Sequence, residues 1–285
     1  MYHNIAFSGG GVHTIAFIGC VKYLEETKNI DSIINVIGSS GGALVALMVV
    51  INLSHQEMKE CIHEVYSQNT QLFSTSIKKI FNIPKKFGMM DSKLIDIFVR
   101  TVLKKKAIEE NVTFLELIKK TGKYLVIPVT NLTQNKREYL SVDTYPEMNI
   151  ITAIQMSTSI PILFEPIKYY NDLYVDSLIY CNFPIDFFKS FPINTLGLNL
   201  VDVKSEKSDI KTFSQYCSLL CDSIFSSLYK SSLNTDKYNI CDVSIPPTIK
   251  NFDFYRFKFV LDSDIIDELV QIGYDNLSIF FQKSN

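Results

Sequence analysis

Little net charge and no long hydrophobic run are the first features of this sequence, and each excludes a class of protein. The 28 lysines and arginines and the 30 acidic residues leave a formal net charge of −2. This balance gives no support for a nucleic-acid partner, because binding nucleic acid needs a basic excess or a basic face. The longest unbroken apolar run, residues 43–51, is well short of the roughly 20 residues that a membrane span requires. We therefore expect a soluble protein that can still touch a membrane surface.

Paired cysteines and metal-ligand spacings are also missing. The six cysteines form no C-x-x-C pair, and the one close cysteine–histidine pair, Cys61 and His63, has no further ligand residues nearby. Most of the cysteines lie among apolar residues, where a reduced thiol behaves as a small hydrophobic group, which favours a reducing, cytoplasmic setting. The chain enters an apolar stretch directly after MYHN, so we expect no signal peptide.

The chain does have enough apolar residues for a large core. Hydrophobic residues make up 47% and charged residues 20% of its 285 residues, as in a globular protein. No internal repeat, low-complexity tail or convincing linker divides it, so we predict a single domain over residues 1–285. A motif-bearing core covers about 4–190, and residues 191–285 add a C-terminal strand and helix extension.

Two consecutive strand–loop–helix units at the start indicate the fold class. Residues 4–7 form an apolar run that ends in the loop Ser8–Gly11, and residues 12–26 then carry apolar side chains at a helical period. The second unit is a strand over 33–37 followed by a helix over 41–53. Such units predict an α/β fold: a three-layer sandwich with a mostly parallel central sheet flanked by helices.

Helical and extended patterns alternate through the remainder of the chain. Ser54 and Glu57 form a capping-box pattern at the start of one helix, and Asp91 or Ser92 caps another. Further helices are predicted over residues 54–66, 92–106, 113–120, 150–159, 184–190, 211–233 and 263–281, and further strands over 124–130, 137–142, 174–176, 195–201, 241–245 and 255–259.

A serine stands at the sharp turn between the second strand and its helix. Gly38, Ser40 and Gly42 match G-x-S-x-G in the strand–turn–helix context that this motif requires. A nucleophile at such a turn is held in strained backbone geometry, and small neighbours let the strand and the helix pack closely around it. We interpret Ser40 as a catalytic nucleophile; the motif alone leaves open a structural Gly/Ser-rich turn.

The loop Gly9-Gly10-Gly11 follows the neighbouring strand and opens a helix. Its backbone N–H groups can converge beside Ser40, because the carboxyl ends of parallel strands meet at one edge of a sheet. This indicates an oxyanion hole. The alternative is a nucleotide-binding loop of the form G-x-G-x-x-G, which Gly9 and Gly11 fit but Thr14 does not.

A serine nucleophile needs a base, and the distribution of histidine limits what that base can be. The four histidines are His3, His13, His55 and His63, so none follows residue 63. The chain order serine, acid, histidine of an α/β-hydrolase triad is therefore not available to Ser40. A carboxylate is the obvious substitute, provided that burial raises its pKa.

Four ordered blocks of the sequence resemble the patatin-like phospholipases, a family of lipid acyl hydrolases. The resemblance spans about residues 4–190, and the final helix is compatible with it. The matching blocks are SGGGVHTIAFIGCVKYLEE (8–26), IGSSGGAL (37–44), Ser157 to Pro161 continuing through Phe164-Glu165-Pro166, and Val175 to Leu178 with Asn182 and Pro184 downstream.

The resemblance implies a Ser–Asp dyad of Ser40 and Asp176, with an oxyanion hole at Gly10 and Gly11 and no metal or organic cofactor. It implies hydrolysis of a phospholipid or an acylglycerol through an acyl-enzyme, at a membrane or lipid-droplet surface. Without the family spacing, we would interpret Asp176 as a turn aspartate at the end of a strand. Asp143 and Asp172 are weaker candidates for the base. A catalytically weak or inactive lipid- or protein-binding module is the alternative.

The sequence departs from the family pattern at two places. His13-Thr14 replaces the usual Arg-Gly after the glycine loop, and Ser177-Leu178 replaces two small residues after Asp176. We expect Ser177-Leu178 to place bulk beside the base, which would change the orientation of the aspartate, narrow the pocket or slow turnover. The stretch containing Phe73, Ile77, Ile80, Phe81, Ile83 and Met89-Met90 is interpreted as a core or satellite helix, with a lid or lipid-facing patch as the alternative.

Overall fold

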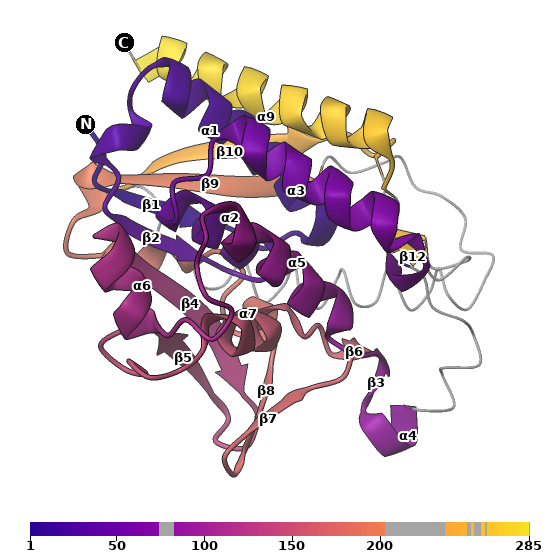
Figure 1. The fold of residues 1–285 in the computed structure, drawn as a ribbon. Coiled ribbons are helices and arrows are strands. Elements are labelled where there is room, and N and C mark those ends of the chain that lie inside the picture. The colour runs from indigo at the N-terminus through magenta and orange to yellow at the C-terminus, as the bar shows by residue number, and fades with distance from the viewer. Residues whose placement is uncertain (74–82, 203–236, 250–251, 254–257, 260, 285) are drawn as a thin grey trace.

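The computed structural model describes residues 1–73, 83–202, 237–249, 252–253, 258–259 and 261–284, and its centre is an eight-stranded sheet (Figure 1). The strand order is β10-β9-β1-β2-β4-β8-β7, with β5 also paired to β4. The bounds are β1 (Asn4–Phe7), β2 (Asn35–Gly38), β4 (Tyr124–Asn131), β5 (Lys136–Leu140), β7 (Ile167–Tyr169), β8 (Asp172–Val175), β9 (Thr195–Asp202) and β10 (Asn239–Ile245).

The sheet is mostly parallel, as predicted. β10, β9, β1, β2 and β4 all run in one direction, whereas β8, β7 and β5 add antiparallel pairs at one side. β1 lies between β2 and β9, and its four residues are fully or almost fully buried. A strand without polar alternation is what a sheet covered on both faces requires.

Alternate residues of the central strands belong to two separate cores. Ile5 and Phe7 of β1 join the large cluster under the helices. Ala6 joins a smaller cluster with Ile37 and with Phe183, on the opposite face. Successive side chains of a strand point to opposite faces, so this partition confirms the three-layer α/β arrangement.

The helices that pack on the larger of the two cores cover one face of the sheet (Figure 1). Their bounds are α1 (Ala16–Glu26), α2 (Gly41–Val50), α3 (His55–Gln68), α5 (Lys93–Lys105), α6 (Phe114–Thr121), α7 (Ile150–Thr158) and α9 (Ser263–Ser284); α4 (Ile83–Lys86) is one turn long. Two short strands, β3 (Gly88–Met90) and β6 (Ile162–Phe164), pair with each other. The remaining short pair is β11 (Phe252–Asp253) with β12 (Lys258–Phe259).

Most predicted elements are confirmed, but two of the predicted helices differ in type or in their first turn. Ser54 and Glu57 form the predicted capping box of α3. The first helix begins with a 3-10 turn over Gly11–Ile15, and the helix predicted over 184–190 is only a 3-10 helix, Pro184–Phe188. The predicted helix over 211–233 lies outside the described residues, as does most of the predicted strand over 255–259.

No helix among the described residues is both long and apolar enough to cross a bilayer. α2 is apolar on every side, but it is 10 residues long and nine of them are buried. Its composition follows from its position between the sheet and other helices.

Helices α1 and α9 cross at two glycines. A Cβ atom on Gly19 would lie 1.8 Å from the carbonyl oxygen of Val270, and one on Gly273 would lie 1.7 Å from that of Ala16. These approaches are to backbone atoms, which cannot rotate away. The C-terminal helix is therefore seated by backbone contact and not only by side-chain packing.

We predict that Gly273→Ala lowers the free energy of unfolding by about 1–3 kcal/mol, because the added methyl group forces the two helices apart. Urea denaturation followed by circular dichroism measures this change. Glu268→Ala, at an exposed position of the same helix, is the control and should change stability by less than about 0.5 kcal/mol. Equal stabilities of the two variants would contradict the close crossing.

Candidate active site

Ser40 stands at the turn between β2 and α2 in a backbone conformation that few non-glycine residues adopt. Its φ is 51° and its ψ is −126°. A Cβ atom on Gly38 would lie 2.2 Å from the carbonyl oxygen of Gly42, and one on Gly42 would lie 2.4 Å from that of Ser8. Both motif glycines are thus needed where strand and helix approach each other. Strain of this kind at a polar side chain is characteristic of functional sites.

The side chains of Ser40 and Asp176 meet, although they are 136 positions apart. Ser40 Oγ donates a hydrogen bond of 2.6 Å to Asp176 Oδ2. The other carboxylate oxygen, Oδ1, accepts a 2.8 Å hydrogen bond from the backbone N–H of Leu178. Ser40 is 5% exposed and Asp176 is 0% exposed. The pair is therefore shielded from bulk water while the serine keeps access to solvent.

The register of the sheet explains why the two residues are level. Ile37 of β2 lies opposite Val126 of β4, so extending this pairing sets Ser40 level with Val129. Val175 of β8 lies opposite Thr130 of the same strand β4. Because β8 runs antiparallel to β4, the next residue, Asp176, is also level with Val129.

Burial raises the pKa of Asp176 from 3.8 to about 7, while the hydrogen bonds from Ser40 and from the Leu178 backbone act in the opposite direction. Removing a carboxylate from water disfavours its charged form, which is the larger effect here. A carboxyl group with a pKa near 7 can both accept and return a proton at neutral pH. Such a shift beside a hydroxyl group is a mark of acid–base chemistry.

The C-terminal end of α7 contacts both members of the pair. Ser157 Oγ accepts a 3.1 Å hydrogen bond from the Ser40 backbone N–H and donates a 2.8 Å hydrogen bond to the carbonyl oxygen of Pro128. The carbonyl oxygen of Ser159 accepts a 2.9 Å hydrogen bond from the Asp176 backbone N–H. Sequence reasoning identified this segment as a family block but missed that it connects the serine to the aspartate.

The predicted glycine loop lies beside Ser40. A Cβ atom on Gly9 would be 3.1 Å from Ser40 Cβ, and the Gly9 N–H donates to the carbonyl oxygen of Asn182 at 2.8 Å. Gly11 has a left-handed φ of 55°, and its carbonyl oxygen accepts a 2.7 Å hydrogen bond from Thr14 Oγ1. Gly10 lies between these two residues. The loop is thus fixed at both ends next to the serine.

The two departures from the family pattern leave the hydrogen bond between Ser40 and Asp176 intact. Ser177 Oγ lies 2.6 Å from Ser39 Oγ in a buried hydrogen bond, and Leu178 holds the aspartate through its backbone. Leu178 is not among the described residues that line the cavity at Ser40. The His13 ring contacts the carbonyl oxygen of Ile249 at 3.1 Å.

The weaker candidates for the base have partners elsewhere. Asp143 accepts a 2.6 Å hydrogen bond from the Tyr124 hydroxyl, and Asp172 accepts a 2.9 Å one from Asn131 Nδ2. The His55 ring is hydrogen-bonded to Glu25. In the part of the chain that the structure describes, no three histidine, cysteine, aspartate or glutamate side chains gather closely enough to hold a metal ion.

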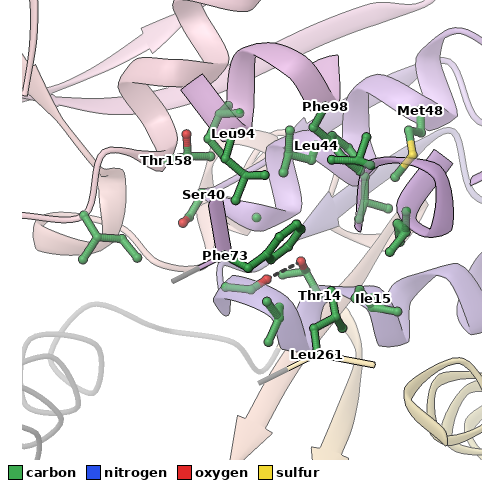
Figure 2. Close-up of a pocket in the computed structure, with 18 of the residues that line it drawn as sticks. Thr14, Ile15, Ser40, Leu44, Met48, Phe73, Leu94, Phe98, Thr158 and Leu261 are labelled. Carbon is green, nitrogen blue, oxygen red and sulfur yellow. Dashed lines mark hydrogen bonds between the residues drawn. The ribbon is translucent and has the colours of Figure 1, made fainter. Parts of the chain in front are cut away.

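Ser40 opens onto an almost wholly apolar cavity of about 130 Å³ (Figure 2). Its polar side chains are those of Ser40, Thr14 and Thr158. Of the stretch proposed as a satellite helix or a lid, Phe73 lines this cavity, Met90 ends β3, and 74–82 lie outside the described residues. The apolar lining comes from α1 and the turn before it, α2, α3, α5 and the segments around them: Val12, Ile15, Ile18, Leu44, Val45, Met48, Ile62, Val65, Phe73, Leu94, Ile95, Phe98, Ile160, Phe164 and Leu261.

Comparisons with known sequences give a matching family model and several relatives. A family model described as patatin-like phospholipase matches residues 5–189. A protein named probable lipid hydrolase 463L, from Invertebrate iridescent virus 6, is 29% identical over 187 residues, which cover 65% of this chain and 62% of the viral protein. The uncharacterized protein YqhO of Bacillus subtilis strain 168 is 30% identical over 223 residues, covering 73% of this chain and 74% of YqhO.

Two solved structures share the fold. VipD from Legionella pneumophila aligns over 99% of this chain and 67% of its own, with a TM-score of 0.57 and 16% identity. The heterodimeric ExoU–SpcU complex from the type III secretion system of Pseudomonas aeruginosa contains a chain that aligns over 99% of this chain and 51% of its own, with a TM-score of 0.52 and 16% identity. At this identity the likeness shows the fold alone.

The raised pKa of Asp176 predicts a pH-dependent stability. The unfolded chain loses this proton near pH 3.8 and the folded protein only near pH 7, so folding stability falls between these values, by on the order of 4 kcal/mol. Asp176→Asn removes the fall, because an amide does not ionise. We expect the variant to gain several degrees in Tm over the wild type as pH rises from about 5 to about 8.

Thermal unfolding of both proteins across this range measures the difference. Asp91→Asn, at an exposed position before α5, serves as the control and should follow the wild type. A constant gap between Asp176→Asn and the wild type at all pH values would show that the carboxyl group is not held protonated by burial.

Proposed function

The chain belongs to the patatin-like phospholipase family, and on that premise we propose that it hydrolyses acyl esters of lipids with Ser40 as nucleophile and Asp176 as general base. The observation that carries the proposal is the 2.6 Å hydrogen bond from Ser40 Oγ to the buried Asp176 carboxylate, at the edge of an apolar cavity. A nucleophile in hydrogen-bond contact with a base of suitable pKa is the arrangement that covalent catalysis needs.

In the first half of the reaction, Asp176 takes the hydroxyl proton as Ser40 Oγ attacks the ester carbonyl carbon. The new C–O bond gives a tetrahedral oxyanion. Asp176 then returns its proton to the leaving alcohol as the ester C–O bond breaks, which leaves an acyl group on Ser40. A pKa near 7 suits a group that must accept and donate the same proton.

The oxyanion is stabilised by backbone N–H groups of Gly10 and Gly11. The loop is anchored beside Ser40, and the amino-terminal end of α2 adds a favourable dipole. The N–H of Ser40 itself is committed to Ser157. The glycine loop is therefore the source of donors that we assign to the oxyanion hole.

In the second half, a water molecule attacks the acyl-enzyme carbonyl with Asp176 again as base. The oxyanion forms a second time, and its collapse breaks the bond to Ser40 Oγ, which recovers its proton from Asp176. The fatty acid is the second product. These steps use only side-chain and backbone groups of this chain together with water, so the mechanism calls for no metal or organic cofactor.

The lining of the cavity favours a lipid substrate. An acyl chain of a phospholipid or an acylglycerol would exchange water for apolar contacts, at about 0.8 kcal/mol for each buried CH₂ group. Such substrates are met at the surface of a membrane or a lipid droplet, and we propose that the protein acts at such surfaces in the cytoplasm. The similarity to a protein named lipid hydrolase supports the same substrate class.

Replacing either member of the dyad should abolish hydrolysis. We predict that Ser40→Ala and Asp176→Asn each lower kcat for a soluble phenyl ester by at least about 10³-fold, because nucleophile and base act as one unit. Initial rates with a phenyl ester and with mixed phospholipid vesicles measure this. His13→Ala, His55→Ala and His63→Ala are the controls and should retain activity.

Two outcomes would overturn this assignment. Equal rates for the wild type and Ser40→Ala would favour a catalytically silent lipid- or protein-binding module that keeps the fold. An inactive histidine variant of normal stability would instead show that the base is not Asp176.

The pH dependence of the rate provides a separate test. Because only the ionised form of Asp176 can accept the Ser40 proton, kcat/KM should fall about tenfold for each pH unit below an apparent pKa near 7. Above that pH the rate should level off. A rate profile that stays flat down to about pH 5 would show that a carboxylate with its usual pKa, or no titrating base, serves Ser40.

A further inference from the structure

The cavity beside Ser40 runs along one face of α2. Ser40, Leu44 and Met48 follow one another at intervals of four residues, so they form a single stripe on that helix. Figure 2 shows Ser40 and Met48 on opposite sides of the lined space, with Leu44 between them. The stripe therefore leads from the nucleophile to the far end of the cavity.

A second stripe runs beside it from the glycine loop. Gly11, Ile15 and Ile18 line the same cavity at helical spacing, and Gly11 lies beside Gly41, the residue after Ser40. Ile62 and Val65 of α3 also line it. Ile18 is 0% exposed, Met48 1% and Val65 2%. Since these side chains are withdrawn from solvent, the end of the cavity at Met48 is closed.

The helix supplies a measure of the cavity's length. Met48 is eight positions after Ser40, which corresponds to about 12 Å at 1.5 Å per residue. A carbon–carbon bond of about 1.5 Å advances an extended chain by about 1.25 Å, because successive bonds zigzag. An acyl group attached to Ser40 can therefore extend about ten carbons before it reaches Met48.

We propose that Met48 limits the acyl chain, so that the site takes acyl groups of up to about ten carbons along α2. This inference rests on the proposed function, because it concerns the acyl group of the same reaction. The Met48 side chain is unbranched and tightly surrounded, and it occupies the position that the next carbons of a longer chain would need. A longer chain must bend back toward the mouth and gains no further buried contact.

A series of p-nitrophenyl esters tests the limit. The chain lengths run in even steps from acetate to tetradecanoate, each assayed as a monomer in solution with the wild type and with Ser40→Ala as the blank. We expect kcat/KM to rise by up to about fourfold per CH₂ group, the equivalent of about 0.8 kcal/mol, until decanoate. From dodecanoate onward it should rise no further.

Two variants should move the limit in opposite directions. Met48→Ala opens space at the closed end, and the optimum should lengthen by two or three carbons. Leu44→Trp fills the stripe about 6 Å from Ser40, half the distance to Met48, and should shorten the optimum to about five carbons. Met58→Ala, a buried methionine on α3 that is not part of the lining, is the matched control and should keep the wild-type optimum.

The outcomes separate this inference from the proposed function. If no ester, acetate included, is hydrolysed faster by the wild type than by Ser40→Ala, the proposed function fails. If acetate is hydrolysed in a Ser40-dependent way, but the optimum of Met48→Ala and Leu44→Trp equals that of the wild type, the function stands and the role of Met48 is refuted. A rate that keeps rising through tetradecanoate in the wild type also refutes it.

Discussion

A carboxyl group with no exposed surface, hydrogen-bonded to a serine in a left-handed backbone conformation, is the constraint on which the site depends. Burying a carboxylate is unfavourable, so Asp176 keeps its proton to a higher pH and becomes a base suited to neutral solution. The same burial demands hydrogen-bond partners, which the Leu178 N–H and the Ser40 hydroxyl provide. The burial of Asp176 thus accounts both for its proposed role as a base and for the expected loss of folding stability as pH rises toward 7.

Strand β4 and the C-terminal end of α7 hold Ser40 and Asp176 in place. β4 pairs with both β2 and β8, and its register sets Ser40 and Asp176 level with each other. The end of α7 then fixes the backbone of both, through Ser157 and the Ser159 carbonyl. Because the Ser157 hydroxyl also donates to β4, a displacement of α7 would move the nucleophile relative to the base. The apolar stripe of α2 begins at this point, so the proposed acyl site and the proposed nucleophile share one helix.

Local patterns were sufficient to predict the parallel sheet and the turn at Ser40. They also led to the prediction that the base is a carboxylate, because no histidine lies beyond residue 63. Asp176 itself was selected by family resemblance, because a lone aspartate after a strand carries no local signal. The contacts of Ser157 were not predictable, since they depend on tertiary packing. The role of Leu178 was not predictable either, because its backbone N–H donates to Asp176 and the residue does not line the cavity at Ser40.

The proposed nucleophile can be tested most directly by the intact mass of the protein after treatment with a fluorophosphonate, followed by peptide mapping. Such a reagent phosphonylates an activated serine and releases fluoride. The dyad predicts one adduct per chain, located on Ser40, at a rate that falls steeply in Asp176→Asn. An unmodified protein, an adduct on a different residue, or equal rates in the wild type and Asp176→Asn would contradict the assignment of Ser40 and Asp176 as the reacting pair.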